Sequence, residues 1–281
     1  MIDVTQLIEQ AHSLTPLPAT TVRLAQLVCS PDCYLEDVAE LIAFDQALTL
    51  KLLRAANSAA SASAVRYGTV KEAVARLGTA QVLAFAVACS TRPFLQSTVP
   101  GYGLDEGALW RHSVASAVAA EIVPEICRVE VPPESFTAAL LHDVGKLVMG
   151  RFLTPEVRGY LRRAYEMDHV APREAESLVL KVHHGELGGI IAQHWKLPVR
   201  VVQGITHHHT PARGMDVICD VTYVANQIAK GIEASVDGRP FELALEPEVT
   251  DRLGIAPKIV ESLCPLAALR YAQVGRRYSA V

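Results

Sequence analysis

The sequence predicts an almost entirely α-helical protein, with an N-terminal helical bundle followed by a second helical bundle. Apolar residues recur at intervals of three and four along most of the chain, as in Leu48, Leu52 and Leu53. This spacing gathers them on one face of a helix. Runs that alternate between apolar and polar residues, which are typical of half-buried strands, are scarce.

Capping residues mark several of the expected helix ends. Thr69 stands directly before "VKEAVARLG" and Ser30 stands before a proline followed by acidic residues. Both are predicted to begin helices, because a hydroxyl can accept hydrogen bonds from the first backbone N–H groups of a helix. Gly78 is predicted to end the helix that Thr69 begins.

The richest break in the helical pattern is "RPFLQSTVPGYGLDEGALW", which concentrates proline and glycine. We place a boundary near residue 100, so that 1–100 form the N-terminal helical part and 101–230 hold most of the histidines. A softer break at "ASVDGRPFELALEP" precedes 231–281. These last residues are predicted to form a C-terminal helical appendage that packs back on the rest.

Composition narrows the class of protein. The chain has 281 residues, half of them apolar, and a formal net charge of −4, which gives no global electrostatic reason to bind nucleic acid or an anionic membrane. No basic leader and no apolar run of membrane-spanning length is expected from the sequence. The six cysteines lack C-x-x-C spacing, so neither disulfides nor a zinc ribbon is predicted. We expect a cytoplasmic location.

Histidines and one aspartate fall on or at the ends of expected helices in the second part of the chain. Side chains from four such elements can converge in the core of a bundle, a known way of building metal sites. Imidazole and carboxylate together favour iron, manganese or zinc over calcium, and such an ion can ionise water for attack on phosphorus. The candidates are His112, His142, Asp143, His184, His208 and His209.

A single histidine on a helix is more often a packed or capping side chain than a metal ligand. Two features favour ligands here. His142 and Asp143 follow the apolar run "FTAALL", where an ionisable pair is costly to bury without a partner. Adjacent His208 and His209 are expected on different sides of a helix, so one packing face does not explain both. We interpret the remaining five as surface or structural residues: His12, His169, His183, His194 and His207.

The segments "LPATTVRLAQLV", "VAELIAFDQALTLKLLRAANSA" and "VKEAVARLGTAQVLAFAV" occur in the N-terminal part. They are followed by "LWRHSVASA", "FTAALLHDVGKLV", "HHGELGGIIAQHWKLP" and "HHTP". In this order they resemble the HDOD domain, the HD-related output domain of bacterial signalling, a branch of the HD phosphohydrolase superfamily. The resemblance spans most of residues 14 to 230. It implies an HD-like second bundle and a regulatory protein that contacts other signalling proteins.

The resemblance also implies roles for single residues. The six candidates above match metal ligands of HD-superfamily sites and of the related HD-GYP phosphodiesterases, with Asp143 as the bridging carboxylate if two ions bind. Lys146 matches a lysine that faces the substrate phosphate in those enzymes, which would make Asp143 and Lys146 catalytic residues. As a plain residue of a helix end, Lys146 would instead interact with the helix dipole.

The chain departs from the catalytic pattern where relatives carry an aspartate in a sequence such as A-D-x-x-A. Here "VANQIAK" offers Asn226, and an amide ligand brings no negative charge to a metal ion. Asp220 does not replace it, because six residues along a helix leave it about 120° away from that face. Trinuclear relatives carry a glutamate where Ala108 stands, and no glycine-tyrosine-proline signature follows "HHTPARGMD".

Two functions stay open at this point. The first is a regulatory HDOD protein that holds one or two divalent ions, and HDOD proteins are generally regarded as lacking demonstrated hydrolase activity. The second is a metal-dependent phosphohydrolase acting on a nucleotide or cyclic dinucleotide. Asn226 discriminates between them. The regulatory function gains if Asn226 faces the metal position and the pocket is closed or empty, and the enzyme gains if another carboxylate fills the site.

Overall fold

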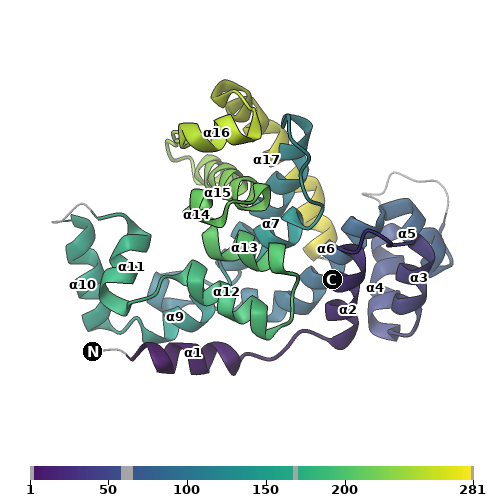
Figure 1. The fold of residues 1–281 in the computed structure, drawn as a ribbon, viewed down its shortest axis with the longest axis horizontal. Coiled ribbons are helices and arrows are strands. Elements are labelled where there is room, and N and C mark those ends of the chain that lie inside the picture. Colours follow the sequence, from purple (N-terminus) through teal and green to yellow (C-terminus); the bar gives the residue numbers. More distant parts are fainter. Residues whose placement is uncertain (1–2, 58–65, 167–169, 280–281) are drawn as a thin grey trace.

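The computed structural model describes residues 3–57, 66–166 and 170–279, and these ranges form helices and loops without a β-strand. A single isolated bridge joins Val99 and Leu104. The predicted all-α fold is therefore confirmed. Figure 1 shows two groups of helices side by side, with a pair of helices projecting at the far end of the second group.

The first group lies on the right of Figure 1 and comprises α2 to α6. Its core is made of leucine, valine and alanine side chains that the helical spacing places on inward faces. The bounds are α2 Ala19–Val28, α3 Leu35–Ala43, α4 Gln46–Ala56, α5 Val70–Leu77 and α6 Thr79–Leu95.

Two of the predicted helix ends are confirmed and one is wrong. Thr69 begins α5 through a capping box with the glutamate three residues later, and Gly78 ends α5 with a φ of 84°. Ser30 does not begin a helix, because its hydroxyl accepts a hydrogen bond from the N–H of Asp32 within a turn. The helix starts only at Leu35.

The second group contains the long central helices. Its helix α15 packs along α7, while α8 and α13 close the same core. The projecting pair on the left of Figure 1 is α10 and α11. The bounds are η2 Pro100–Tyr102, α7 Ala108–Ile122, η3 Val123–Glu125, α8 Ser135–Leu141, α9 Lys146–Phe152, α10 Pro155–Glu166, α11 Pro172–Leu180, α12 His184–His194, α13 Val199–His207, α14 Pro211–Gly214 and α15 Val217–Val236.

The two ends of the chain both pack on this second group. Helix α1 (Val4–His12) lies against α9 and α12 rather than within the first group. The C-terminal helices α16 (Pro247–Leu253) and α17 (Pro257–Ser279) pack back on α15 and α7, as the sequence predicts. The division near residue 100 stays a prediction.

None of the described helices is by itself both long and apolar enough to cross a membrane. Helices α5 and α6 together meet the same criteria of length and composition, but they are bent by 107° relative to each other.

Candidate metal centre

His142 and Asp143 lie in the turn between α8 and α9, in the middle of the second group. All seven residues of α8 are buried, which fixes the position of this turn. Gly145 allows the turn to lie against the start of α12, because a Cβ there would be 1.9 Å from the carbonyl oxygen of His184. As a result, Oδ1 of Asp143 lies 3.3 Å from Nε2 of His184.

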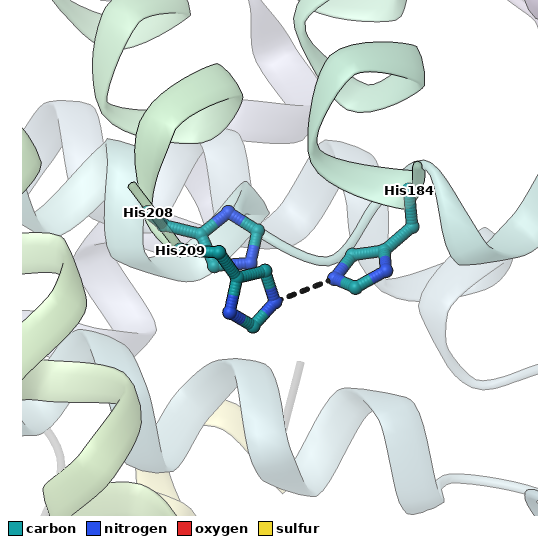
Figure 2. A group of neighbouring side chains, drawn as sticks. All are labelled: His184, His208 and His209. Carbon is teal, nitrogen blue, oxygen red and sulfur yellow. Dashed lines mark hydrogen bonds between the residues drawn. The ribbon is translucent and has the colours of Figure 1, made fainter. Parts of the chain in front are cut away.

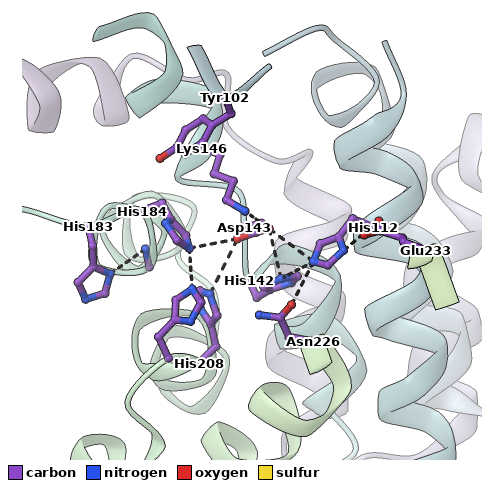
Figure 3. Close-up of polar contacts among 12 residues, drawn as sticks. Tyr102, His112, His142, Asp143, Lys146, His183, His184, His208, Asn226 and Glu233 are labelled. Atoms are coloured by element: carbon purple, nitrogen blue, oxygen red, sulfur yellow. Dashed lines mark hydrogen bonds and ion pairs between the residues drawn. The ribbon is translucent and has the colours of Figure 1, made fainter. Parts of the chain in front are cut away.

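One group of potential ligands consists of His112 from α7 with His142 and Asp143. The Nε2 atoms of the two histidines are 3.2 Å apart. Oδ2 of Asp143 lies 3.6 Å from Nε2 of His112 and 3.4 Å from Nε2 of His142. Figure 3 shows these three side chains converging from two elements.

A second group consists of His184, His208 and His209, drawn in Figure 2. Nε2 of His184 lies 2.9 Å from Nε2 of His209, and Nε2 of His208 lies 3.9 Å from Oδ1 of Asp143. Asp143 therefore stands between the two groups with one oxygen toward each. In both groups the potential ligand atoms lie within 4.8 Å of one another.

The expectation that His208 and His209 point to different sides of a helix is wrong. Helix α13 ends at His207, so the adjacent pair lies in the turn that follows. Their ring centroids are 4.1 Å apart, and both rings face the same cluster. The end of the helix, rather than its periodicity, brings the two imidazoles together.

Asn226 extends from α15 toward the potential ligands His112, His142 and Asp143, and it is buried. Its Oδ1 lies 3.2 Å from Nε2 of His112. Asp220, on the same helix, is instead paired with Arg252 of α16 at 2.6 Å. The structure thus places all seven residues proposed from the sequence in one cluster, together with Lys146, and it leaves Asp220 outside.

Outer hydrogen bonds orient four of the imidazoles. In each ring Nδ1 faces an oxygen of a carbonyl or carboxylate, which can only accept, so Nδ1 carries the donated hydrogen. A neutral ring then keeps its Nε2 lone pair for the cluster, the arrangement seen around metal ligands. The pairs are His112 with Glu233 at 3.1 Å, His142 with Ala139 at 2.7 Å, His184 with Glu176 at 2.7 Å and His208 with Ile205 at 2.7 Å.

Two acceptors in the cluster are buried without a hydrogen-bond partner among the described residues: Nε2 of His208 and Oδ1 of Asp143. Such atoms are costly to bury. The Nε2 atoms of His112 and His142 also lie 3.2 Å apart, a contact that needs a proton or a metal ion between the two nitrogens. The residues therefore fit a bound cation.

The protonation states suit metal binding. Burial lowers the pKa of His142 and of His208, with neighbouring histidines adding to the effect in His208, so both rings stay neutral near pH 7. Burial would raise the pKa of Asp143, but Lys146 and the nearby histidines outweigh it and hold that pKa well below its usual range. Neutral imidazoles and a carboxylate are the forms that bind metal ions.

Lys146 donates a hydrogen bond to Oδ2 of Asp143 at 2.6 Å. Its Nζ also lies 5.7 Å from the centre of the Tyr102 ring, whose hydroxyl donates to Glu176 at 2.7 Å. The ammonium group also borders a cavity of about 670 Å³ that opens beside the cluster. His112, His184, His209 and Asn226 also line this cavity.

The sequence interpretation missed three residues around the cluster: Glu176, Lys230 and Glu233. Lys230 and Glu233 follow Asn226 by four and seven residues on α15, so helical periodicity could have placed them on the same face. Glu176 lies on a different helix, α11. No spacing rule connects it to His184.

The other histidines that the structure describes lie outside the cluster. His183 caps α12, because its ring accepts from the N–H groups of Gly185 and Glu186. The rings of His12 and His194 lie 5.2 Å apart where α1 meets α12, and His207 ends α13. His169 lies outside the described residues.

Comparison with known proteins identifies the family. A family model described as the HDOD domain matches residues 14–211, which is more than half of the chain, so the chain belongs to the HDOD-domain family. An uncharacterized protein of Treponema pallidum (strain Nichols) is 26% identical over 202 residues. That match covers 72% of this chain but only 38% of the relative, so the chain corresponds to less than half of that protein.

Solved structures share the fold. A protein of Marinobacter aquaeolei VT8, provisionally named a signal transduction protein, has a TM-score of 0.74 at 20% identity and covers 98% of this chain and 65% of its own. An HDOD domain protein with unknown function from Geobacter sulfurreducens has a TM-score of 0.64 at 21% identity, covering 99% and 98%. A protein of Shewanella amazonensis SB2B, provisionally named a metal-dependent phosphohydrolase, has a TM-score of 0.57 at 23% identity. The match covers 98% of this chain and 96% of that protein.

Proposed function

We propose that this chain is a bacterial regulatory protein of signal transduction, which works in the cytoplasm by contacting other signalling proteins. The observation that carries the proposal is that the cluster contains little negative charge. Among the described residues Asp143 is the one carboxylate in the cluster, and the amide of Asn226 stands beside His112 where a second carboxylate would be needed. Glu176 and Glu233 bind the outer Nδ1 atoms of His184 and His112 instead.

Two further observations support this proposal. The Marinobacter protein of the same fold is provisionally named a signal transduction protein. All six cysteines carry free thiols, which suits a reducing compartment such as the cytoplasm.

The proposed metal content is one or two divalent ions of iron, manganese or zinc. His112, His142 and Asp143 would hold the first ion, with Asn226 as a neutral fourth ligand. His184, His208 and His209 would hold the second, and Asp143 would bridge the two. Binding of this kind stabilises the folded state, because the ligands come together only when the chain is folded. In a regulatory protein such a centre would keep α7, α12 and α15 in fixed positions.

A second candidate function is a metal-dependent phosphohydrolase acting on a nucleotide or cyclic dinucleotide. The cavity beside the cluster favours it, since a closed site would admit no substrate, and the Shewanella neighbour carries a name of this kind. An ion held here would make a bound water a stronger acid and hence a nucleophile at neutral pH. In this function Lys146 would bind a phosphate oxygen, and Asp143 would be the carboxylate shared by the two groups of histidines.

Hydrolysis assays distinguish the two candidates. Purified protein is tested with Mn²⁺, Zn²⁺ or, without oxygen, Fe²⁺ on p-nitrophenyl phosphate, bis(p-nitrophenyl) phosphate and a cyclic dinucleotide. The regulatory proposal predicts the same turnover for the wild type as for the His142→Ala/Asp143→Ala variant. Metal-dependent turnover that only the wild type shows would contradict the proposal and establish the second candidate.

A further inference from the structure

The outer part of the cavity is built by the C-terminal half of α15 and by α17. Lys230, Ile232 and Glu233 come from α15, and Tyr271 comes from α17. These residues follow residue 211, where the match to the HDOD domain ends. This wall therefore lies beyond the segment that the family model matches.

Lys230 is the residue of this wall that lacks a close partner. It follows Asn226 by four residues and so lies on the same face of α15. Among the described residues it takes part in no hydrogen bond or ion pair, whereas the other four cationic side chains of the cavity each have one. Those four are Lys146 to Asp143, Arg111 to the carbonyl of Glu106, Arg173 to Glu174 and Arg239 to Asp237.

Two ammonium groups thus share the neighbourhood of one carboxylate. Lys146 already bonds Asp143 at 2.6 Å. Lys230 is half-buried, and burial together with the charge of Lys146 lowers its pKa, although Asp143 and Glu233 act in the opposite direction. A half-buried cation without a hydrogen-bonded anion is unfavourable, and an anion between the two lysines would remove this cost.

The rest of the cavity suits an organic body rather than a bare anion. Its volume of about 670 Å³ falls within the range of small-molecule sites. Leu104, Leu109 and Ile232 line it together with the half-buried aromatic ring of Tyr271. Such a ring offers a stacking surface for a planar heterocycle.

We propose that the cavity binds a nucleoside monophosphate, with the phosphate between Lys230 and Lys146 and the base against Tyr271. In one respect the inference rests on the proposed function: the ligand is an effector that is bound and released unchanged. Lys230 and Tyr271, which select the ligand, both lie beyond the segment that the family model matches.

Equilibrium dialysis tests this proposal with AMP and GMP as probes and with ribose 5-phosphate and inorganic phosphate as comparisons. We expect at least one nucleotide to bind more tightly than both comparisons. Lys230→Met should weaken its binding by about 10- to 100-fold, the worth of a hydrogen bond to a charged group, and Lys230→Arg should keep most of it. Lys71→Met, at an exposed lysine of α5 paired only with Glu36, should bind as the wild type does.

A measurement on the wild type alone guards against a variant that fails to fold. Reductive methylation followed by mass spectrometry should modify Lys230 in the free protein and be blocked by the bound nucleotide, while Lys71 stays reactive. Binding of neither nucleotide, or equal binding by Lys230→Met that is folded, would overturn the inference. If inorganic phosphate bound as tightly as AMP, the inference that the cavity recognises a nucleoside would be overturned.

The same samples separate this inference from the proposed function. Chromatography of the dialysed nucleotide shows whether it is recovered intact, and elemental analysis shows whether Lys230→Met keeps the metal. Conversion of AMP to adenosine by the wild type would contradict the regulatory function while leaving the binding site in place. AMP that is recovered intact but binds equally well without Lys230 would contradict the proposed binding site and leave the regulatory function in place.

Discussion

The side-chain oxygen of Asn226 lies 3.2 Å from Nε2 of His112, inside the histidine cluster. A neutral amide therefore occupies the side of the cluster where catalytic relatives are expected to carry a carboxylate. Of the two conditions set for a regulatory protein, the structure meets the first, because Asn226 faces the cluster. Of the second condition, that the pocket be closed or empty, the structure answers only the first half, because the cavity beside the cluster is open.

Asn226→Asp should tighten metal binding. The added carboxylate would face Nε2 of His112 and supply a negative charge to the ion. Changes around metal ligands alter affinity by about 10- to 100-fold, so we expect a gain of about tenfold or more in competition with a chelating dye. Gln227→Glu adds the same charge one residue along α15 and should change little. An unaltered affinity in Asn226→Asp would show that this position is not a ligand.

Glu176→Gln should weaken metal binding through His184. One oxygen of Glu176 accepts hydrogen bonds from both the ring Nδ1 and the backbone N–H of His184, at 2.7 and 2.9 Å. Removal of its charge makes the imidazole a poorer ligand, and affinity should fall by about 10- to 100-fold. Glu174→Gln, at an exposed glutamate on the same helix, is the matched control. Equal metal affinity in the two variants would contradict this role.

The metal-free protein should lose stability when the pH falls below the ordinary range of histidine. Burial lowers the pKa of His142 and His208 in the folded state, so the unfolded state binds more protons just below pH 6.5. Each such group then removes about 1.4 kcal/mol of unfolding free energy per pH unit. Urea unfolding in the presence of a chelator, from about pH 7.5 to about pH 5.5, measures the slope. A flat profile would mean that these histidines are not buried as neutral rings.

Gly145→Ala should destabilise the protein. The added methyl group would lie 1.9 Å from the carbonyl oxygen of His184 and 2.8 Å from the backbone nitrogen of Gly188, so α12 must move away. Overpacking of this kind costs about 1–3 kcal/mol. Gly159→Ala is the control, because nothing lies within 4 Å of its Cβ, and alanine in α10 should add about 1 kcal/mol. Thermal unfolding of both variants checks the contrast.

Much of the cluster could be predicted because its residues occur in ordered motifs. The apolar run before His142 is a local feature. Asn226 follows from the resemblance to relatives of the HD superfamily, and helical periodicity then determines which residues of the same helix share its face. The same reasoning separated Asp220 from the cluster, and the structure pairs Asp220 with Arg252.

Other features depend on contacts between distant segments. The turn after α13, which directs His208 and His209 to one side, depends on where the helix ends. The pairing of Glu176 with His184 joins two helices that no periodicity relates. The packing of α1 against α9 and α12 also could not be read from its own apolar face, since any apolar partner would satisfy that face.

The most direct test of the metal centre is elemental analysis of protein purified without chelator or added metal, beside the His142→Ala/Asp143→Ala variant. We predict about one or two equivalents of iron, manganese or zinc in the wild type, and none in a folded variant. Wild-type protein that is folded but free of metal, or a variant that retains the same amount, would contradict the assignment. The "HD" pair would then be a structural element of the bundle.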